Sequence, residues 1–158
     1  MYVTDTLGKD AEKKIKEWLD RPDEGYDFQR LPDQMTGFYG SSNICDFVLY
    51  KYPNHYWIES KATWNDRFDF SMLTDTQYDG LLNKSKINGV DGIVIVLFAS
   101  YQRAFWISIK EIDRLKQSGK KSLNILKIDK WGIDYHEIKT IPNNRKKLLD
   151  YDKNQLFI

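Results

Sequence analysis

Residues 93–99 form a run of seven consecutive apolar residues, and this run constrains the fold more than any other part of the chain. A strand with one face in water alternates apolar and polar residues, so an unbroken run predicts a β-strand buried on both faces. Such a strand needs other elements packed on both sides of its sheet. The run is about a third of the roughly 20 residues that a membrane-spanning helix needs, so no such helix is expected.

Three segments have the pattern of helices. Within residues 8–19, four apolar side chains share one helical face: Ala11, Ile15, Trp18 and Leu19. Thr74 precedes Gln77 by three residues, as in a capping box, and predicts a second helix that ends near Gly89. Residues 110–117 predict a short third helix.

The remaining segments favour strands. Residues 45–51 and 55–61 are rich in aromatic and β-branched residues, and a turn that contains Pro53 separates them, which predicts a β-hairpin. Further strands are expected at residues 28–31, 93–99, 104–109, 123–128 and 135–141. This order indicates an α/β or α+β sheet with packed helices. A length of 158 residues suits one domain, residues 1–158, around one core.

The predicted hairpin gathers three charged residues on one face. With the turn centred on the Pro53–Asn54 bond, Asp46 pairs with Lys61. Glu59 then pairs with Val48. Diagonal neighbours in an antiparallel pair lie roughly 7 to 8 Å apart at Cα, which lets the carboxylates of Asp46 and Glu59 converge on one ion. A slip of one residue would move Asp46 to the other face.

Carboxylates beside a lysine suit the hydrolysis of a phosphodiester. A cation neutralises the phosphate and lowers the pKa of an attacking water, and carboxylate oxygens suit Mg²⁺. Lys61 would orient that water or stabilise charge that develops on phosphorus. The alternative is a surface hairpin with an ordinary ion pair between Asp46 and Lys61, and a Glu-x-Lys pattern alone does not separate the two.

Two more polar residues have open roles. Glu12 lies at the edge of the apolar stripe of the first predicted helix, so its carboxylate either reaches the same site or is a solvated helix charge. Gln77 either completes the capping box or reaches a phosphate or the attacking water.

Charge is unevenly distributed along the chain. The net charge is +1, but residues 100–158 hold 13 basic and 7 acidic residues. Such a basic region is either a solvated lysine-rich face or a phosphate-binding surface. The candidate DNA contacts in it are Lys120, Lys121, Arg145, Lys146 and Lys147.

Several classes of protein are excluded. A single cysteine, Cys45, forms no intrachain disulfide, and with only His55 and His136 beside it the chain has no Cys/His cluster for zinc. Neither histidine has the neighbours of a hydrolase triad. The first residues lack the basic start and apolar core of a secretory signal, so cytoplasmic residence and no membrane association are expected.

Several motifs together resemble a known superfamily. They are SSNICDF at residues 41–47, IESKAT at 58–63, FDF at 68–70 and TQY at 76–78, and they continue through 91–98, 105–107 and 118–123. In this order they resemble the PD-(D/E)xK nucleases, and among these the RecU-type Holliday junction resolvases. The resemblance covers most of residues 8–125.

The resemblance implies a role for each candidate residue. The implied metal ligands are Asp46, Glu59, the backbone carbonyl of Ser60, and Glu12 on the first helix. The implied catalytic residues are Asp46, Glu59, Lys61 as the catalytic lysine, and Gln77 on the helix that follows. The resemblance also implies an α/β, restriction-endonuclease-like fold, with a mixed central β-sheet flanked by helices.

Members of this family are homodimeric DNA endonucleases that act on branched DNA in recombination and repair, with Mg²⁺ as cofactor and Mn²⁺ as a substitute. They carry a projecting stalk before the catalytic aspartate, and residues 21–45 are too few for a full one. Nuclease chemistry is therefore implied more firmly than junction specificity. The alternatives are a restriction-type or nicking endonuclease with the same active site, and a DNA-binding module without catalysis.

Overall fold

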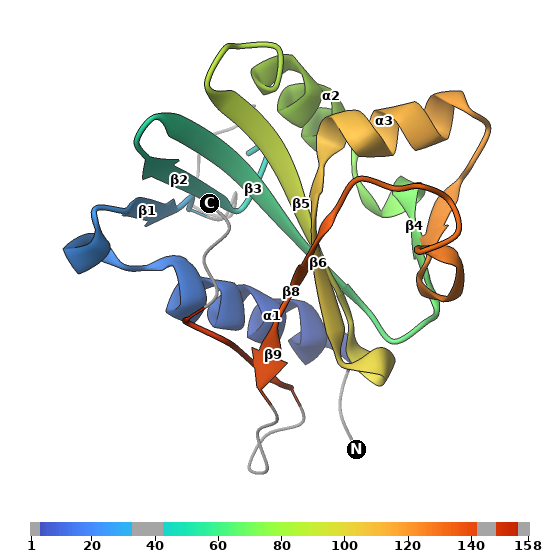
Figure 1. The fold of residues 1–158 in the computed structure, drawn as a ribbon, viewed down its shortest axis with the longest axis horizontal. Coiled ribbons are helices and arrows are strands. Elements are labelled where there is room, and N and C mark those ends of the chain that lie inside the picture. Colours follow the sequence, from blue (N-terminus) through green and yellow to red (C-terminus); the bar gives the residue numbers. More distant parts are fainter. Residues whose placement is uncertain (1–3, 33–42, 142–147, 155–158) are drawn as a thin grey trace.

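The computed structural model describes residues 4–32, 43–141 and 148–154. In this part of the chain a mixed sheet of six strands has helices on both faces (Figure 1). The helices are α1 (Thr4–Leu19), α2 (Asp75–Lys84) and α3 (Ile109–Gln117). The strands of this central sheet, in spatial order, are β1 (Asp27–Arg30), β2 (Phe47–Lys51), β3 (Asn54–Thr63), β5 (Val90–Phe98), β6 (Arg103–Ser108) and β8 (His136–Ile138).

Strand β5 confirms the prediction from the apolar run. It pairs in parallel with β3 and antiparallel with β6, and its side chains from Ile93 to Phe98 are buried. Ile93 and Ile95 belong to the cluster that includes α1, whereas Val94 belongs to the cluster that includes α2 and α3. The strand is therefore covered on both faces, as its continuous apolar sequence requires.

Both capping and close packing fix the position of α2. Thr74 accepts a hydrogen bond from the Gln77 backbone, and the capping box is complete, as predicted. The helix ends at Lys84 rather than near Gly89, because the chain must turn back into β5, and Gly89 makes this turn with φ +79°. A Cβ at Gly92 would lie 2.6 Å from the Leu81 carbonyl oxygen, so glycine lets α2 approach β5 closely.

The hairpin of β2 and β3 forms, but its register differs from the prediction. Phe47 pairs with Ile58, and Lys51 pairs with Asn54. The connection is therefore a loop of two residues, Tyr52 and Pro53, because Asn54 joins the ladder. The regular ladder ends at Phe47, because the Asp46 N–H donates to the carbonyl of Ile58, the partner of Phe47, so the predicted pairing of Asp46 with Lys61 was wrong. Within the ladder, a shift of two residues keeps every side chain on its predicted face.

The C-terminal strand predictions were partly wrong. Residues 122–124 form β7 (Ser122–Asn124), which pairs with β4 (Arg67–Asp69), but Ile125–Lys127 is a 3₁₀ helix, because the Asn124 side chain caps the Leu126 N–H. The segment 135–141 splits into β8 and β9 (Thr140–Ile141), and β9 pairs with β10 (Asp150–Tyr151).

The first helix begins at Thr4, ahead of its apolar stripe. No helix in the described residues is both long and apolar enough to span a membrane.

Candidate active site

Asp46 directly precedes β2, and its backbone is hydrogen-bonded to the chain on both sides. Its N–H donates to the Ile58 carbonyl at 3.0 Å, and its carbonyl accepts from the Leu31 N–H at 2.7 Å. Its side-chain Oδ2 accepts a hydrogen bond from the Ser60 N–H at 2.9 Å. These contacts direct the Asp46 carboxylate toward the middle of β3.

Glu59 is buried in β3, with only 3% of its surface exposed. Its neighbour Ile58 belongs to the core cluster of α1, so the Glu59 side chain points to the other face of the sheet, which α2 covers. There Gln77 Nε2 donates to Glu59 Oε2 at 3.0 Å. A carboxylate with this exposure is rare unless it is paired or binds a metal.

The surroundings of Glu59 oppose its ionisation. Burial is the largest cause that raises the pKa of Glu59 far above its ordinary value, and the Asp46 carboxylate adds to it. Lys61 acts in the opposite direction, and Glu12 contributes a smaller repulsion. Two adjacent carboxylates share a buried site at low cost only if a proton or a cation lies between them. The arrangement therefore suits a divalent cation.

The backbone of Ser60 adds an oxygen at this position. The N–H and C=O groups of one strand residue point to the same edge of the strand. Because the Ser60 N–H reaches Asp46 Oδ2, the Ser60 carbonyl points to the edge of β3 where Asp46 lies. This edge is beyond the last β2–β3 pair, Phe47 with Ile58. A cation held by Asp46 and Glu59 would have this carbonyl within reach.

Lys61 follows Glu59 by two residues and lies on the same face of β3. Its side chain is half-buried, and its charge acts on Glu59. Glu59 and Lys61 therefore share one face of β3, as predicted, and Asp46 approaches them through its hydrogen bond with the Ser60 N–H.

Gln77 completes the capping box, one of the two roles left open by the sequence, and its side chain also contacts Glu59. Its Oε1 accepts a hydrogen bond from the Thr74 N–H at 3.0 Å, which completes the capping box. Its Nε2 holds Glu59. One side chain therefore joins the start of α2 to the buried carboxylate.

Glu12 lies apart from this group. Its Oε2 is 3.3 Å from Arg30 Nη2, an ion pair that sequence reasoning missed because α1 and β1 meet only in the folded chain. In the described residues, no three side chains of Asp, Glu, His or Cys come together as metal ligands. The structure thus gathers two carboxylates and a carbonyl, and places Glu12 at their periphery.

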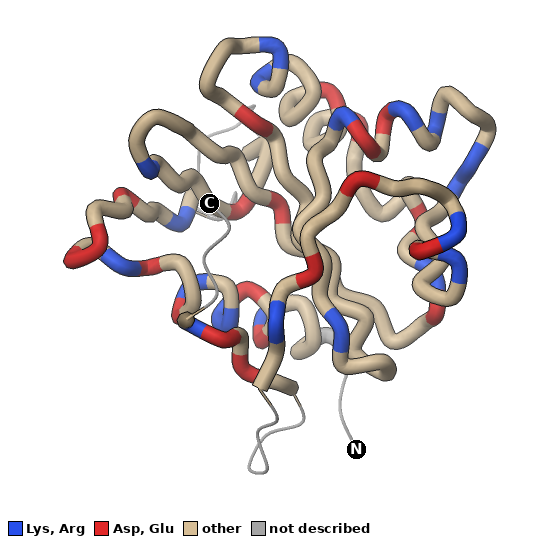
Figure 2. Tube along the Cα trace, in the orientation of Figure 1, with Lys and Arg blue, Asp and Glu red and all other residues tan. Residues whose placement is uncertain are grey.

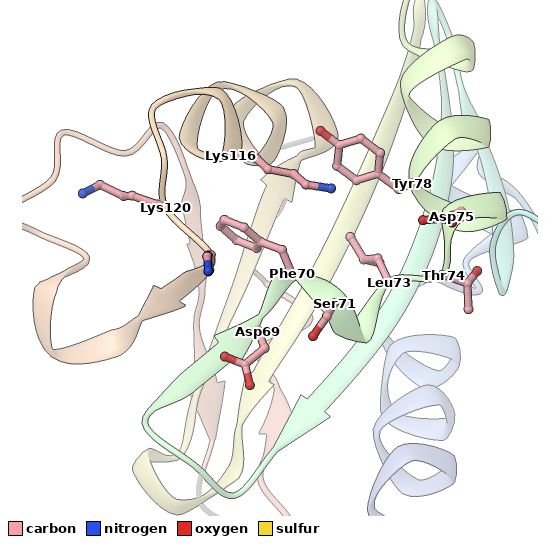
Figure 3. Close-up of a pocket in the computed structure, with 10 residues that line it drawn as sticks. Asp69, Phe70, Ser71, Leu73, Thr74, Asp75, Tyr78, Lys116 and Lys120 are labelled. Carbon is pink, nitrogen blue, oxygen red and sulfur yellow. The ribbon is translucent and has the colours of Figure 1, made fainter.

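A basic pocket of about 660 Å³ opens beside the site (Figure 3). Its lining includes Thr74, the cap residue that contacts Gln77, and it also includes the carboxylates of Asp69 and Asp75. Three lysines line it: Lys116, Lys120 and Lys121. The Lys116 ammonium lies 4.3 Å from the centre of the Tyr78 ring, and that of Lys120 lies 4.0 Å from the centre of the Trp131 ring.

Lys120 and Lys121 are among the DNA contacts predicted from the sequence, whereas Lys116 is not, although it lines the same pocket. The signal for Lys116 was available, since it occupies the last turn of α3, shortly before Lys120. Arg145, Lys146 and Lys147 lie outside the described residues. Figure 2 shows basic positions at the end of α3 and in the segment that follows.

Two comparisons with known proteins find similarity. The model of the family Recombination protein U (RecU) matches residues 33–153, a range that contains Asp46, Glu59, Lys61 and Gln77 but not Glu12. None of the curated proteins compared with the chain matches it. A similar solved structure is that of Hjc, a Holliday junction resolvase from the archaeal hyperthermophile Archaeoglobus fulgidus.

The similarity to Hjc is one of fold. The TM-score is 0.52 at 15% sequence identity, over 74% of this chain and 88% of that chain. It confirms the predicted fold class, α/β with a mixed central sheet flanked by helices.

Proposed function

This chain belongs to the Recombination protein U family, and we propose that it is a metal-dependent DNA endonuclease that resolves four-way (Holliday) junctions in recombination. The family match confirms the resemblance to RecU-type resolvases of the PD-(D/E)xK nuclease superfamily. The observation that carries the proposal is the convergence of Asp46 and Glu59, with Lys61 on the same face, in a site where burial disfavours uncompensated negative charge.

The donor set fits a hard divalent cation, and the family implies a requirement for one. Asp46, Glu59 and the Ser60 carbonyl would hold Mg²⁺, with Mn²⁺ as a substitute, because all three offer oxygen ligands. When bound, the ion supplies charge neutralisation at the phosphate and a more acidic water. Gln77 holds one oxygen of Glu59 in place, and the other would be available to the ion.

Lys61 stabilises the negative charge that develops during the reaction. As water oxygen attacks phosphorus and a P–O bond of the phosphodiester breaks, negative charge grows on the phosphoryl oxygens. An ammonium held beside Glu59 stabilises that charge and is already in place before the reaction.

Glu12 is proposed as an outer contributor to the same metal site. Its carboxylate binds Arg30, and its repulsion of Glu59 indicates that it lies within electrostatic reach. Mg²⁺ commonly keeps several waters, so Glu12 would act through one of them rather than directly.

DNA contact is proposed along the basic pocket beside α2. Lys120 and Lys121 line it, and Arg145, Lys146 and Lys147 belong to the same basic third of the sequence. Lysines that border a concave surface attract a phosphate backbone.

A homodimer of single-domain subunits is proposed as the working assembly. Two nicks on strands of like polarity need two active sites, and a two-fold symmetric dimer supplies them in the symmetry of the junction. A mixed dimer of wild type and Glu59→Ala is expected to nick one strand only. A protein that remains monomeric by light scattering, free and on DNA, would contradict the dimer.

The decisive experiment compares DNA forms with the same sequence. The protein is incubated with Mg²⁺ and labelled four-way junction, duplex or single-stranded DNA, and paired nicks on the junction are expected. Glu59→Ala should abolish cleavage while it leaves junction binding largely intact, with Asp23→Asn, an exposed carboxylate outside the site, as the control. Preferential cleavage of duplex would favour the restriction-type alternative, and binding without any cleavage would favour the non-catalytic module.

A further inference from the structure

A row of lysines on α1 borders a second groove, of about 370 Å³. The row consists of Lys9, Lys13 and Lys16, which are all exposed and follow one another at helical spacing. The groove is lined by Lys9, Glu12, Lys13, Lys16, Arg30 and Phe47. Figure 2 shows basic positions along α1.

Two acidic residues close to this row are engaged with other cations. Glu12 forms its ion pair with Arg30, and Glu17 lies 3.5 Å from the buried ammonium of Lys14. Lys14 also pairs with Asp150 of β10. Within the described residues, no ion pair neutralises Lys9, Lys13 or Lys16, so the rim of the groove keeps their positive charge.

This groove adjoins the candidate active site. Its lining residue Phe47 directly follows Asp46, and Phe47 pairs with Arg30 between β2 and β1. Glu12, on the opposite wall, is close enough to Glu59 to repel it. The groove therefore lies next to the Asp46 end of β2, on the α1 face of the sheet.

The basic pocket of Lys116, Lys120 and Lys121 lies on the other face of the sheet, the face to which Glu59 points. Its lining residue Thr74 is hydrogen-bonded to Gln77, which in turn is hydrogen-bonded to Glu59. Because α1 covers one face of the sheet and α2 and α3 cover the other, the two basic surfaces flank the site (Figure 1).

We infer that the α1 groove binds the DNA backbone on one side of the scissile phosphate, while the pocket of Lys116, Lys120 and Lys121 binds it on the other side. This inference rests on the proposed nuclease function. The dimensions agree, since seven helical residues rise about 10 Å and a DNA strand presents a phosphate about every 3.4 Å along its axis. The lysine row can therefore meet about three phosphates.

The first test measures how junction affinity depends on salt. Lys9→Ala/Lys13→Ala/Lys16→Ala is compared with its parent, both in a Glu59→Gln background that prevents cleavage. The slope of log affinity against log salt should fall in magnitude by roughly 0.7 to 0.9 for each phosphate that the variant no longer neutralises, or about 2 in total. The matched control, Lys86→Ala/Lys110→Ala/Lys153→Ala, removes three exposed lysines that line neither basic surface and should leave the slope unchanged.

The second test locates the bound phosphates on the DNA. Single phosphates on either side of the cleavage position are replaced by neutral methylphosphonates, and each should weaken binding of the parent protein. The α1 triple variant should be insensitive to replacements on one side only, and Lys116→Ala/Lys120→Ala/Lys121→Ala should be insensitive on the other side only. Such a pattern reports specific lysine–phosphate pairs, which a general loss of stability does not reproduce.

The outcomes separate the inference from the proposed function. If the wild-type protein cleaves the junction but the α1 variant keeps the parent slope, or loses affinity equally for replacements on both sides, the α1 groove is not a DNA surface. If the wild-type protein neither binds nor cleaves DNA, both proposals fail. Lys9→Gln/Lys13→Gln/Lys16→Gln, which keeps most of the side-chain length, should repeat the result with an unchanged thermal midpoint.

Discussion

Gln77 Nε2 donates a 3.0 Å hydrogen bond to Glu59 Oε2, while Oε1 of the same side chain accepts one from the N–H of Thr74. The residue that completes the cap of α2 therefore also fixes one oxygen of the buried carboxylate. Helix capping and site geometry are coupled through one side chain. The two roles of Gln77 are separable by mutation, because the Thr74 hydroxyl bonds to the Gln77 backbone N–H and supports the cap without bonding to Glu59.

Gln77→Ala should lower the cleavage rate by roughly 10- to 100-fold, since a hydrogen bond to a charged group contributes about 1.5 to 3 kcal/mol. It should also raise the Mg²⁺ concentration needed for half-maximal activity. Thr74→Ala is the control, expected to cost about 0.5 to 2 kcal/mol of stability but little activity. The measurements are single-turnover cleavage against Mg²⁺ and thermal melting. Equal losses of activity in both variants would assign Gln77 to capping alone.

Lys61→Ala should slow cleavage by about 10² or more, as does the loss of a comparable electrostatic donor from other hydrolytic sites. Single-turnover rates at saturating Mg²⁺ isolate this effect from metal binding. Lys110→Ala removes an exposed lysine at the start of α3 and serves as the control. A Lys61 variant within twofold of wild type would leave that lysine a structural role only.

Metal-free protein should lose stability as the pH rises above the ordinary glutamate range. Because burial and Asp46 raise the pKa of Glu59 in the folded state, the folded protein keeps a proton that the unfolded chain has released. The stabilising contribution is complete below the unfolded pKa of about 4.3 and declines as pH rises toward the folded pKa. Glu59→Gln should abolish this decline.

Mg²⁺ that takes the place of the Glu59 proton should counteract the loss of stability at high pH. It should therefore raise the thermal midpoint more at about pH 8 than at about pH 5.5. Thermal melts of wild type and Glu59→Gln, with and without Mg²⁺, measure both effects. An equal pH dependence in the two proteins would remove Glu59 as its source.

Lys120→Ala/Lys121→Ala should weaken junction binding and reduce the salt slope by roughly 0.9 for each phosphate of the duplex arms that is no longer neutralised. Lys127→Ala/Lys130→Ala, two exposed lysines of the same basic third that do not line the pocket, should have a smaller effect. Binding is measured by fluorescence anisotropy over a salt series. An unchanged slope in the Lys120/Lys121 variant would move the DNA path away from this pocket.

The sequence predicted those features that depend on local pattern. The apolar run of β5 indicated a strand covered on both faces, and the Thr74–Gln77 spacing indicated the start of α2. Side-chain alternation placed Asp46, Glu59 and Lys61 on one face. The predicted pairing of Asp46 with Lys61 was wrong, because a shift of two residues preserves every face and the turn length alone selects between the registers.

By itself, the sequence determined the class of sheet, the hairpin beside which Asp46 and Glu59 meet, and the family to which the chain belongs. The tertiary structure decided which charges neutralise one another. Residues 1–45 contain 9 acidic and 6 basic residues and look unsuited to DNA, yet folding pairs Glu12 with Arg30 and Lys14 with Asp150 and leaves a row of lysines exposed. Coulomb interactions depend on distance in space, and only the packing of α1 against the sheet sets the distances among residues so far apart in the chain.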